Sequence, residues 1–240
     1  MKTIVVENLS FQYQPDSDLV LNNINFHINQ GEAAVITGLT GCGKSTLCLC
    51  ISGAIRHKRD GVVTGEVMVN GKNIREISRG RLALEVGIVF QDPDTQLFLP
   101  TVEDEIAFAP ENLCLEPDSI KTRINNVLEL LGITALRDEN PCNLSGGEKQ
   151  LVALGAVLAL DPPVLILDEV MSQLDIEGKK RVVSTLKNLR DKGKSIIMVE
   201  HDIQAVEFSD RLMVMEQGRI IRFDETDCFG RSAFWDRYET

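Results

Sequence analysis

A glycine-rich segment early in the chain has the residue spacing of a phosphate-binding loop. It consists of Gly38, Leu39, Thr40, Gly41, Cys42, Gly43, Lys44, Ser45 and Thr46. This order fits the pattern GxxxxGK[ST], in which backbone N–H groups turn toward phosphate oxygens at the partly positive start of a helix. Lys44 then reaches the β- and γ-phosphates of a nucleotide, and the Ser45 hydroxyl binds Mg²⁺. A glycine-rich turn is the alternative, but the apolar strand before the loop and the helix after it favour phosphate binding.

Two acidic residues follow a short apolar run later in the chain. Residues 164–167 are Val, Leu, Ile and Leu, and Asp168 and Glu169 come next. Such a run predicts a parallel strand covered on both faces, and ligands bind at the carboxyl ends of these strands. Asp168 is therefore the candidate to hold Mg²⁺, and Glu169 the candidate general base that polarises the attacking water. An acidic strand-to-loop pair is common by itself, but the phosphate-binding loop upstream favours nucleotide hydrolysis.

The elements that must position these residues alternate between strand and helix at both ends of the chain. Alternating or continuous apolar runs predict strands at residues 4–8, 20–28, 32–38, 63–74, 84–91, 163–169, 195–201 and 211–221. Asn70-Gly71 and Gln217-Gly218 are predicted hairpin turns. Helical spacing or composition predicts helices at residues 46–55, 119–133 and 176–194.

This order of elements predicts an α/β fold with a helical insertion. We expect a single domain over residues 1–240, with a P-loop NTPase core, a mixed sheet and an N-terminal antiparallel β subdomain. Residues 1–91 and 161–240 form the core with the β subdomain in this prediction, and residues 92–160 form the helical subdomain.

A second anion-binding motif narrows the class of NTPase. It consists of Leu144, Ser145, Gly146, Gly147, Glu148, Lys149 and Gln150. Two glycines after a serine, at the start of a helix, make another helix N-terminus suited to phosphate. A monomer with one nucleotide has no obvious use for a second such site. The motif resembles the LSGGQ signature of ATP-binding-cassette (ABC) ATPases; a capped helix start is the alternative for the motif taken alone.

Other residues stand where this resemblance predicts functional groups. Tyr13 resembles the aromatic residue that stacks on adenine, with Phe11 as its competitor. Gln91 resembles the Q-loop glutamine that senses Mg²⁺ and the transmembrane partner. Ser172 and Asp175 lie in a segment that resembles the D-loop, and His201 resembles the switch histidine that contacts the γ-phosphate.

The resemblance covers nearly the whole chain and implies a shared mechanism. Two cassettes, as a homodimer or a heterodimer, close head to tail on two ATP molecules with Mg²⁺. Each ATP lies between the P-loop of one subunit and the signature residues Ser145, Gly146 and Gly147 of the other. The implied catalytic residues are Lys44, Gln91, Glu169 and His201. A transmembrane coupling subunit converts the cycle of closure and hydrolysis into transport.

A longer match indicates the kind of transporter. Residues 90–113, FQDPDTQLFLPTVEDEIAFAPENL, resemble the segment after the Q-loop in energy-coupling-factor (ECF) importers of vitamins and transition-metal ions. This resemblance implies a peripheral protein on the cytoplasmic face of the cell membrane. The acidic residues of the segment are expected to meet basic coupling helices of the membrane subunit, with a solvated helical face as the alternative. They are Asp92, Asp94, Glu103, Asp104 and Glu105.

Several positions depart from the usual ABC pattern. Leu151 stands where Arg is common, and Val170-Met171 replaces Pro-Thr. The chain ends soon after its final strands, which fits either a short variant or part of a two-cassette polypeptide. Cys42 within the P-loop suggests that alkylation there blocks ATP binding; the alternative is a small residue tolerated in the loop.

Composition excludes several other classes of protein. The net charge of -11 argues against a general nucleic-acid binder. Six cysteines without a CxxC pair indicate reduced thiols, and the longest apolar stretch, residues 151–160, is too short to span a bilayer. Chromosome-type ABC ATPases need a long coiled coil between their halves, and this sequence contains none. Translation-type ABC proteins carry two cassettes and are basic, whereas this sequence shows one cassette and is acidic. The remaining alternative is a catalytically silent subunit that senses nucleotide. Such a subunit would lack the general base or the switch histidine, but this sequence contains both Glu169 and His201.

Overall fold

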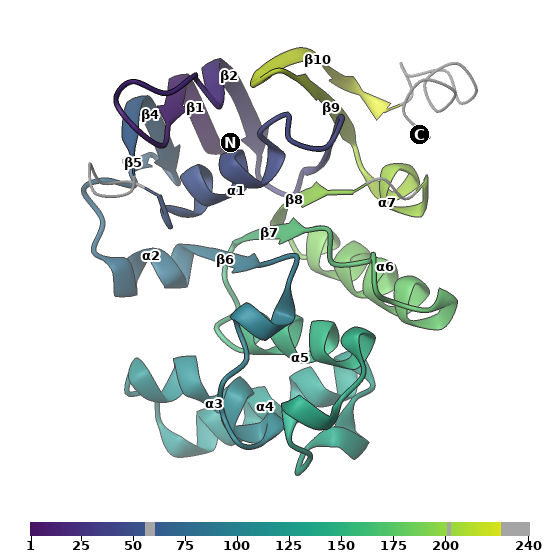
Figure 1. Cartoon of the computed structure of the whole chain (residues 1–240). Helices are drawn as coiled ribbons and strands as arrows, with labels where there is room; N and C mark the ends of the chain where they lie inside the picture. Colours follow the sequence, from purple (N-terminus) through teal and green to yellow (C-terminus); the bar gives the residue numbers. More distant parts are fainter. Residues whose placement is uncertain (56–60, 201–202, 227–240) are drawn as a thin grey trace.

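Strands from both ends of the chain build two β-sheets (Figure 1). The computed structural model describes residues 1–55, 61–200 and 203–226. The antiparallel sheet, in the order β2-β1-β4-β5, contains β1 (Lys2–Gln12), β2 (Leu21–Asn29), β4 (Val62–Val69) and β5 (Lys72–Asn73). The mixed sheet, in the order β10-β9-β3-β8-β7-β6, contains β3 (Ala33–Thr37), β6 (Val86–Val89), β7 (Val164–Asp168), β8 (Ser195–Val199), β9 (Arg211–Glu216) and β10 (Arg219–Glu225).

Both predicted hairpin turns are confirmed. Asn70 and Gly71 join β4 to β5 with φ angles of 49° and 75°, and Gln217 and Gly218 join β9 to β10 with φ angles of 46° and 74°. Positive φ at both central residues matches the twist of the flanking antiparallel strands, and Asn-Gly tolerates this conformation best.

The mixed sheet has apolar cores on both of its faces. Strands β6, β7, β8, β3 and β9 are parallel, and β10 adds an antiparallel edge. Along β7, Leu165 and Leu167 enter one core while Val164 and Ile166 enter the other. Burial on both faces explains why this strand is an almost continuous apolar run. The parallel arrangement brings the carboxyl ends of β3, β6, β7 and β8 to one edge, where the candidate site lies.

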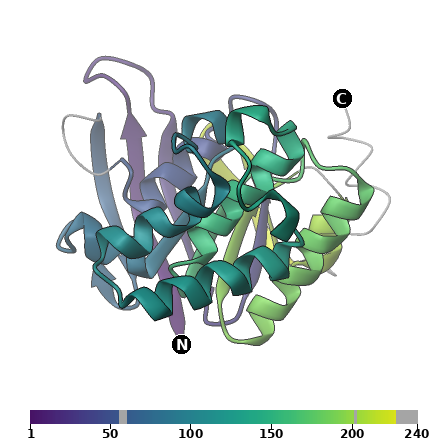
Figure 2. The same ribbon diagram turned by 90° about the horizontal axis from the view of Figure 1, so that it is seen from below.

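Helices of the middle of the chain group together away from the antiparallel sheet (Figure 1). They are α3 (Val102–Asn112), α4 (Pro117–Leu131) and α5 (Gly146–Leu158). In the view from below they lie in front of the strands, beside α6 (Ile176–Asp191) (Figure 2). The predicted α/β fold, with its mixed sheet, antiparallel sheet and helical insertion, is confirmed. The domain boundaries at residues 91–92 and 160–161 remain a proposal.

Two helices were not predicted. Residues 79–85, which overlap the start of a predicted strand, form α2 (Arg79–Glu85), so β6 begins only at Val86. Among the residues of α2 only Leu82 is buried, so no apolar stripe marks the helix in the sequence. The second unpredicted helix is α7 (Ile203–Phe208), and α1 (Lys44–Ser52) follows the loop described next.

Candidate active site

The P-loop, residues 38–46, connects β3 to α1. Gly38 and Gly43 have φ angles of 148° and 105°. A Cβ atom on Gly38 would lie 2.2 Å from the Met215 carbonyl oxygen, and a Cβ atom on Gly43 would lie 2.8 Å from the Val20 carbonyl oxygen. Only glycine therefore fits at these two positions. The buried Lys44 turns back over the loop, where its Nζ donates to the carbonyl oxygens of Gly38 (2.7 Å) and of Leu39. Helix α1 begins without a side-chain cap, which suits an anion-binding N-terminus.

Asp168 and Ser45 form a donor set suited to Mg²⁺. Asp168 ends β7 and is 5% exposed, and its Oδ1 atom has no hydrogen-bond partner among the described residues. Burial raises the pKa of this carboxyl above its usual value, and a hydrogen bond from the Ser45 hydroxyl opposes that shift. A buried carboxylate oxygen without a partner, next to a hydroxyl, fits a hard divalent cation that takes oxygen ligands.

Glu169 and Gln91 come together from two different strand ends. Gln91 follows β6, and its Nε2 donates to Oε2 of Glu169 at 2.5 Å. Glu169 has a φ angle of 51°, and its backbone N–H is held by the Val199 carbonyl oxygen at 2.9 Å. The turn after β7 therefore projects the carboxylate toward the Q-loop glutamine. The arrangement suits a general base oriented by an amide.

The structure distinguishes the two aromatic candidates for adenine stacking. Tyr13 is 53% exposed, and its hydroxyl hydrogen-bonds the Thr46 hydroxyl at 3.2 Å. Phe11 is fully buried and meets the Tyr13 ring edge to face, with centroids 4.8 Å apart. Only the Tyr13 ring can offer a face to a planar ligand beside the P-loop, so the geometry favours Tyr13.

Cys42 differs from what the alkylation hypothesis requires. Its side chain is 7% exposed, and burial raises the pKa of the thiol. Alkylation needs an accessible thiolate, so both properties slow the reaction. The exposed cysteines Cys114 and Cys142 are better targets. The structure therefore favours the alternative in which Cys42 fills a small buried position of the loop.

The signature motif, residues 144–150, starts α5 with a capping box. The Ser145 side chain accepts from the backbone N–H of Glu148, and the Glu148 carboxylate accepts from the Ser145 N–H at 2.9 Å and from its hydroxyl at 2.7 Å. These bonds hold the pKa of Glu148 below its usual range. Leu144 is half-buried against the helical core, and the unusual Leu151 is buried in the same core. This motif thus forms a rigid helix start with its two glycines at the surface end.

A cavity of about 690 Å³ lies beside the signature motif. Ser145, Gly146, Gly147 and Glu148 line it together with the D-loop residues Gln173 and Asp175. None of the P-loop residues contributes to this cavity. Within the described part of the chain, the two candidate phosphate sites therefore do not line this cavity together.

The D-loop residues have local structural partners. The Ser172 hydroxyl donates to the Glu169 carbonyl oxygen at 2.8 Å. The Asp175 carboxylate caps α6 by accepting from the Gly178 N–H at 2.7 Å. The unusual Val170 and Met171 are buried in the core, so they replace Pro-Thr without exposing apolar surface. Ser172 thus ties the D-loop directly to the turn that carries the candidate base.

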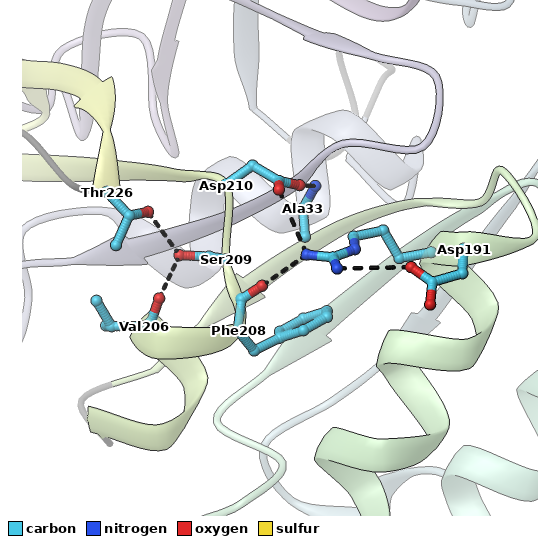
Figure 3. Close-up of polar contacts among 8 residues, drawn as sticks. Ala33, Asp191, Val206, Phe208, Ser209, Asp210 and Thr226 are labelled. Carbon is cyan, nitrogen blue, oxygen red and sulfur yellow. Dashed lines mark hydrogen bonds and ion pairs between the residues drawn. The ribbon is translucent and has the colours of Figure 1, made fainter.

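His201, the predicted switch histidine, lies outside the described residues. Glu200, just before it, is buried, and its Oε1 accepts from the Met171 N–H at 2.9 Å. Downstream, the Ser209 hydroxyl bonds Thr226, while Asp210 accepts from the Ala33 N–H (Figure 3). These contacts hold Glu200 against the turn after β7 and hold Asp210 against the start of β3. The role of Glu200 was not predicted, because nothing in the sequence marks a buried carboxylate before the histidine.

The acidic segment after the Q-loop is only partly available to a partner. Glu105 is 4% exposed and accepts from the backbone N–H groups of Phe98 and Leu99, so the expectation that it meets a membrane subunit is wrong. Its carboxylate satisfies buried backbone donors instead. Asp94 forms an ion pair with Lys149 at 2.7 Å, and Glu103 forms one with Arg137 at 3.3 Å.

Comparison with known proteins decides the family. The family model described as ABC transporter matches residues 21–172, more than half of the chain. The chain belongs to the ABC transporter family. As a member of this family, the protein is an ATPase.

Two relatives illustrate the similarity in sequence. A Pyrococcus horikoshii protein, provisionally named ABC transporter ATP-binding protein PH1815, is 45% identical over 223 residues, 92% of this chain and 78% of the relative. The energy-coupling factor transporter ATP-binding protein EcfA of Methanosarcina acetivorans is 42% identical over 219 residues, 91% of this chain and 78% of EcfA. Other relatives are longer, and the chain spans 37% of one from Methanosarcina mazei.

Two solved structures confirm the fold of the cassette. CbiO1 of Clostridium perfringens, part of the ABC transporter complex CbiONQ, superposes with a TM-score of 0.82 at 35% identity, over 96% of this chain and 91% of CbiO1. The dimeric cassette MJ0796, bound to ADP and Pi, superposes with a TM-score of 0.83 at 24% identity, over 93% of this chain and 98% of that cassette. Among the described residues of this chain, no helix is long and apolar enough to cross a bilayer.

Proposed function

We propose that this ABC ATPase powers an ECF-type importer of a vitamin or a transition-metal ion. The identity with EcfA and the likeness to CbiO1 support this class. The resemblance of residues 90–113 to ECF ATPases agrees with this class. In this proposal two copies of the chain act together from the cytoplasmic face of the membrane, held there by a transmembrane coupling subunit.

The observation that carries the dimer is the separation of two phosphate-type sites in one chain. The P-loop and the signature cavity share no lining residue, yet both start helices with groups suited to phosphate. A head-to-tail pair brings the two kinds of site together, because the P-loop of one copy then faces the signature motif of the other. Since this chain carries both halves and the candidate base, two copies suffice to build two complete sites. The dimeric state of MJ0796 supports the arrangement.

Within each shared site, the chain's own residues have distinct tasks. Lys44 exchanges the Gly38 and Leu39 carbonyl oxygens for phosphate oxygens, and Tyr13 stacks on adenine. Ser45, Asp168 and Gln91 would hold Mg²⁺, which neutralises charge on the phosphates when bound. Glu169 accepts a proton from the attacking water. ATP favours the closed pair because only that state makes both sets of phosphate contacts.

An aromatic pair beside the acidic segment suits the membrane subunit. Phe98 and Phe108 are 67% and 42% exposed, and their rings meet edge to face with centroids 5.0 Å apart. Exposed aromatic pairs are uncommon on a solvated surface and are enriched at interfaces. The exposed carboxylate of Asp94 lies in the same segment, between the Q-loop and α3. We assign this surface, residues 94–108, to an amphipathic basic segment of the coupling subunit.

Replacing Phe98 with Ser tests this assignment. We expect the variant to lose at least 90% of its co-purification with the ECF transmembrane subunit of its own organism, because truncating a central aromatic anchor typically removes most of the affinity of an interface. Retention on the tagged membrane subunit after detergent extraction is the measurement. Ile221→Ser, which removes an exposed apolar side chain on β10, is the matched control and should co-purify normally. Equal retention of both variants would place the docking surface elsewhere.

A further inference from the structure

Gln150 links the signature helix to the end of strand β6. It stands in the second turn of α5, is 2% exposed, and its Nε2 donates to the Phe90 carbonyl oxygen at 3.1 Å. Its Oε1 is buried and has no hydrogen-bond partner among the described residues. An unsatisfied buried oxygen opposes folding, so stability alone does not account for an amide at this position.

A second amide holds the same strand end. Gln96 accepts from the Phe90 N–H at 3.1 Å through Oε1, and its Nε2 donates to the Ile88 carbonyl oxygen at 3.2 Å. In the described mixed sheet, β6 is an edge strand that pairs with β7 alone. Side chains therefore supply the bonds that a further strand would give. Both polar backbone groups of Phe90 are fixed, one by Gln96 and the other by the signature helix.

The residue after Phe90 is Gln91, which donates to the candidate base Glu169 at 2.5 Å. The Phe90 carbonyl group that Gln150 binds belongs to the peptide bond between Phe90 and Gln91. Gln91, in turn, binds the Glu169 carboxylate. The Lys149–Asp94 ion pair links the same two segments, but Asp94 is largely exposed. Exposed ion pairs contribute little because water screens them, so the buried amide is the stronger connection.

We propose that Gln150 is a positioning residue that couples the signature motif to the Glu169 carboxylate of the same subunit. When the signature helix moves onto the nucleotide of the partner copy, Gln150 carries Phe90 and Gln91 with it and sets the orientation of Glu169. Each subunit then hydrolyses its own ATP efficiently only after its signature motif has engaged the other ATP. This coupling rests on the shared-site dimer proposed above.

Gln150→Met tests the link, because it keeps the side-chain length and removes the donor. At saturating Mg-ATP we expect kcat to fall at least tenfold, while KM for ATP and the affinity for a fluorescent ATP analogue change less than twofold, since the P-loop is untouched. Leu154→Ala, a buried truncation in the same helix, is the matched control; it lowers the melting temperature but keeps kcat within twofold. If Gln150→Met fails to fold, Gln96→Leu replaces it, because this substitution removes the hydrogen bond to the Phe90 N–H. We expect the same result, a lower kcat with an unchanged KM for ATP.

The outcomes separate the link from the dimer itself. A folded Gln150→Met or Gln96→Leu variant with kcat within twofold of the wild type would overturn the link and leave the dimer intact. Equal loss of kcat in Leu154→Ala would also overturn it, because helix stability would then explain the effect. A wild-type chain with neither ATP-dependent pairing nor turnover would overturn the dimer and the link together.

Discussion

Glu169→Gln is expected to lower the ATPase rate by about 10²- to 10⁴-fold, the usual contribution of a general base. The substitution removes the proton acceptor but preserves the shape of the side chain. The Gln91 amide still finds an oxygen acceptor at the replaced position, so the geometry at the end of β7 survives. Affinity for Mg-ATP should therefore stay within a few-fold of the wild type. Steady-state phosphate release and equilibrium binding of an ATP analogue measure the two quantities.

A surface carboxylate supplies the control for this prediction. Glu76 is exposed and distant in sequence from every candidate site residue, so Glu76→Gln should match the wild type in both assays. Turnover above a tenth of the wild-type rate in Glu169→Gln would assign the proton-accepting role to another group. Loss of ATP binding would instead show that Glu169 supports the nucleotide rather than the chemistry.

Lys44→Met should weaken nucleotide binding itself. Lys44 is the buried cation of the P-loop, and its ammonium group now donates to two loop carbonyl oxygens that phosphate oxygens would replace. A hydrogen bond that involves a charged group contributes about 1.5–3 kcal/mol, so we expect ATP affinity to fall about 10- to 150-fold. Isothermal titration with Mg-ATP measures the loss, and turnover at low ATP should fall with it.

The control for Lys44 removes an equal charge elsewhere. Lys72 is exposed on β5, so Lys72→Met changes the net charge equally and should bind ATP normally. The melting temperature of Lys44→Met must also be followed, because the side chain fastens the loop to itself. Normal ATP affinity in a folded Lys44→Met chain would contradict the assignment of residues 38–46 as the nucleotide site.

Local patterns with a strict spacing were predictable from the sequence. The P-loop, the two hairpin turns and the buried β7 each depend on residues within one short segment, where glycine conformation and strand periodicity dominate. The mixed and antiparallel sheets then followed from the order of elements. Helix α2 was missed because a single buried leucine gives no periodic signal.

Contacts between segments distant in the sequence were not predictable. Because Glu105 lies in an acidic run, the sequence predicts an exposed side chain. In the fold its carboxylate instead points inward and accepts hydrogen bonds from the backbone N–H groups of Phe98 and Leu99. The hydrogen bond from Gln150 to the Phe90 carbonyl oxygen joins residues 60 positions apart, and no pattern in either segment predicts it. The choice between Phe11 and Tyr13 likewise needed their burial in the fold, because Phe11 is buried in β1 whereas Tyr13 lies exposed just beyond the end of that strand.

The mass of the Glu169→Gln chain in solution, with and without Mg-ATP, tests the shared site most directly. Because this variant retains ATP, it should shift from monomer to twice the monomer mass in light scattering. Adding Gly146→Asp should keep it monomeric although it still binds ATP, since a carboxylate at the start of α5 repels the partner's phosphates. A monomer at saturating ATP, or a dimer that tolerates Gly146→Asp, would contradict the account.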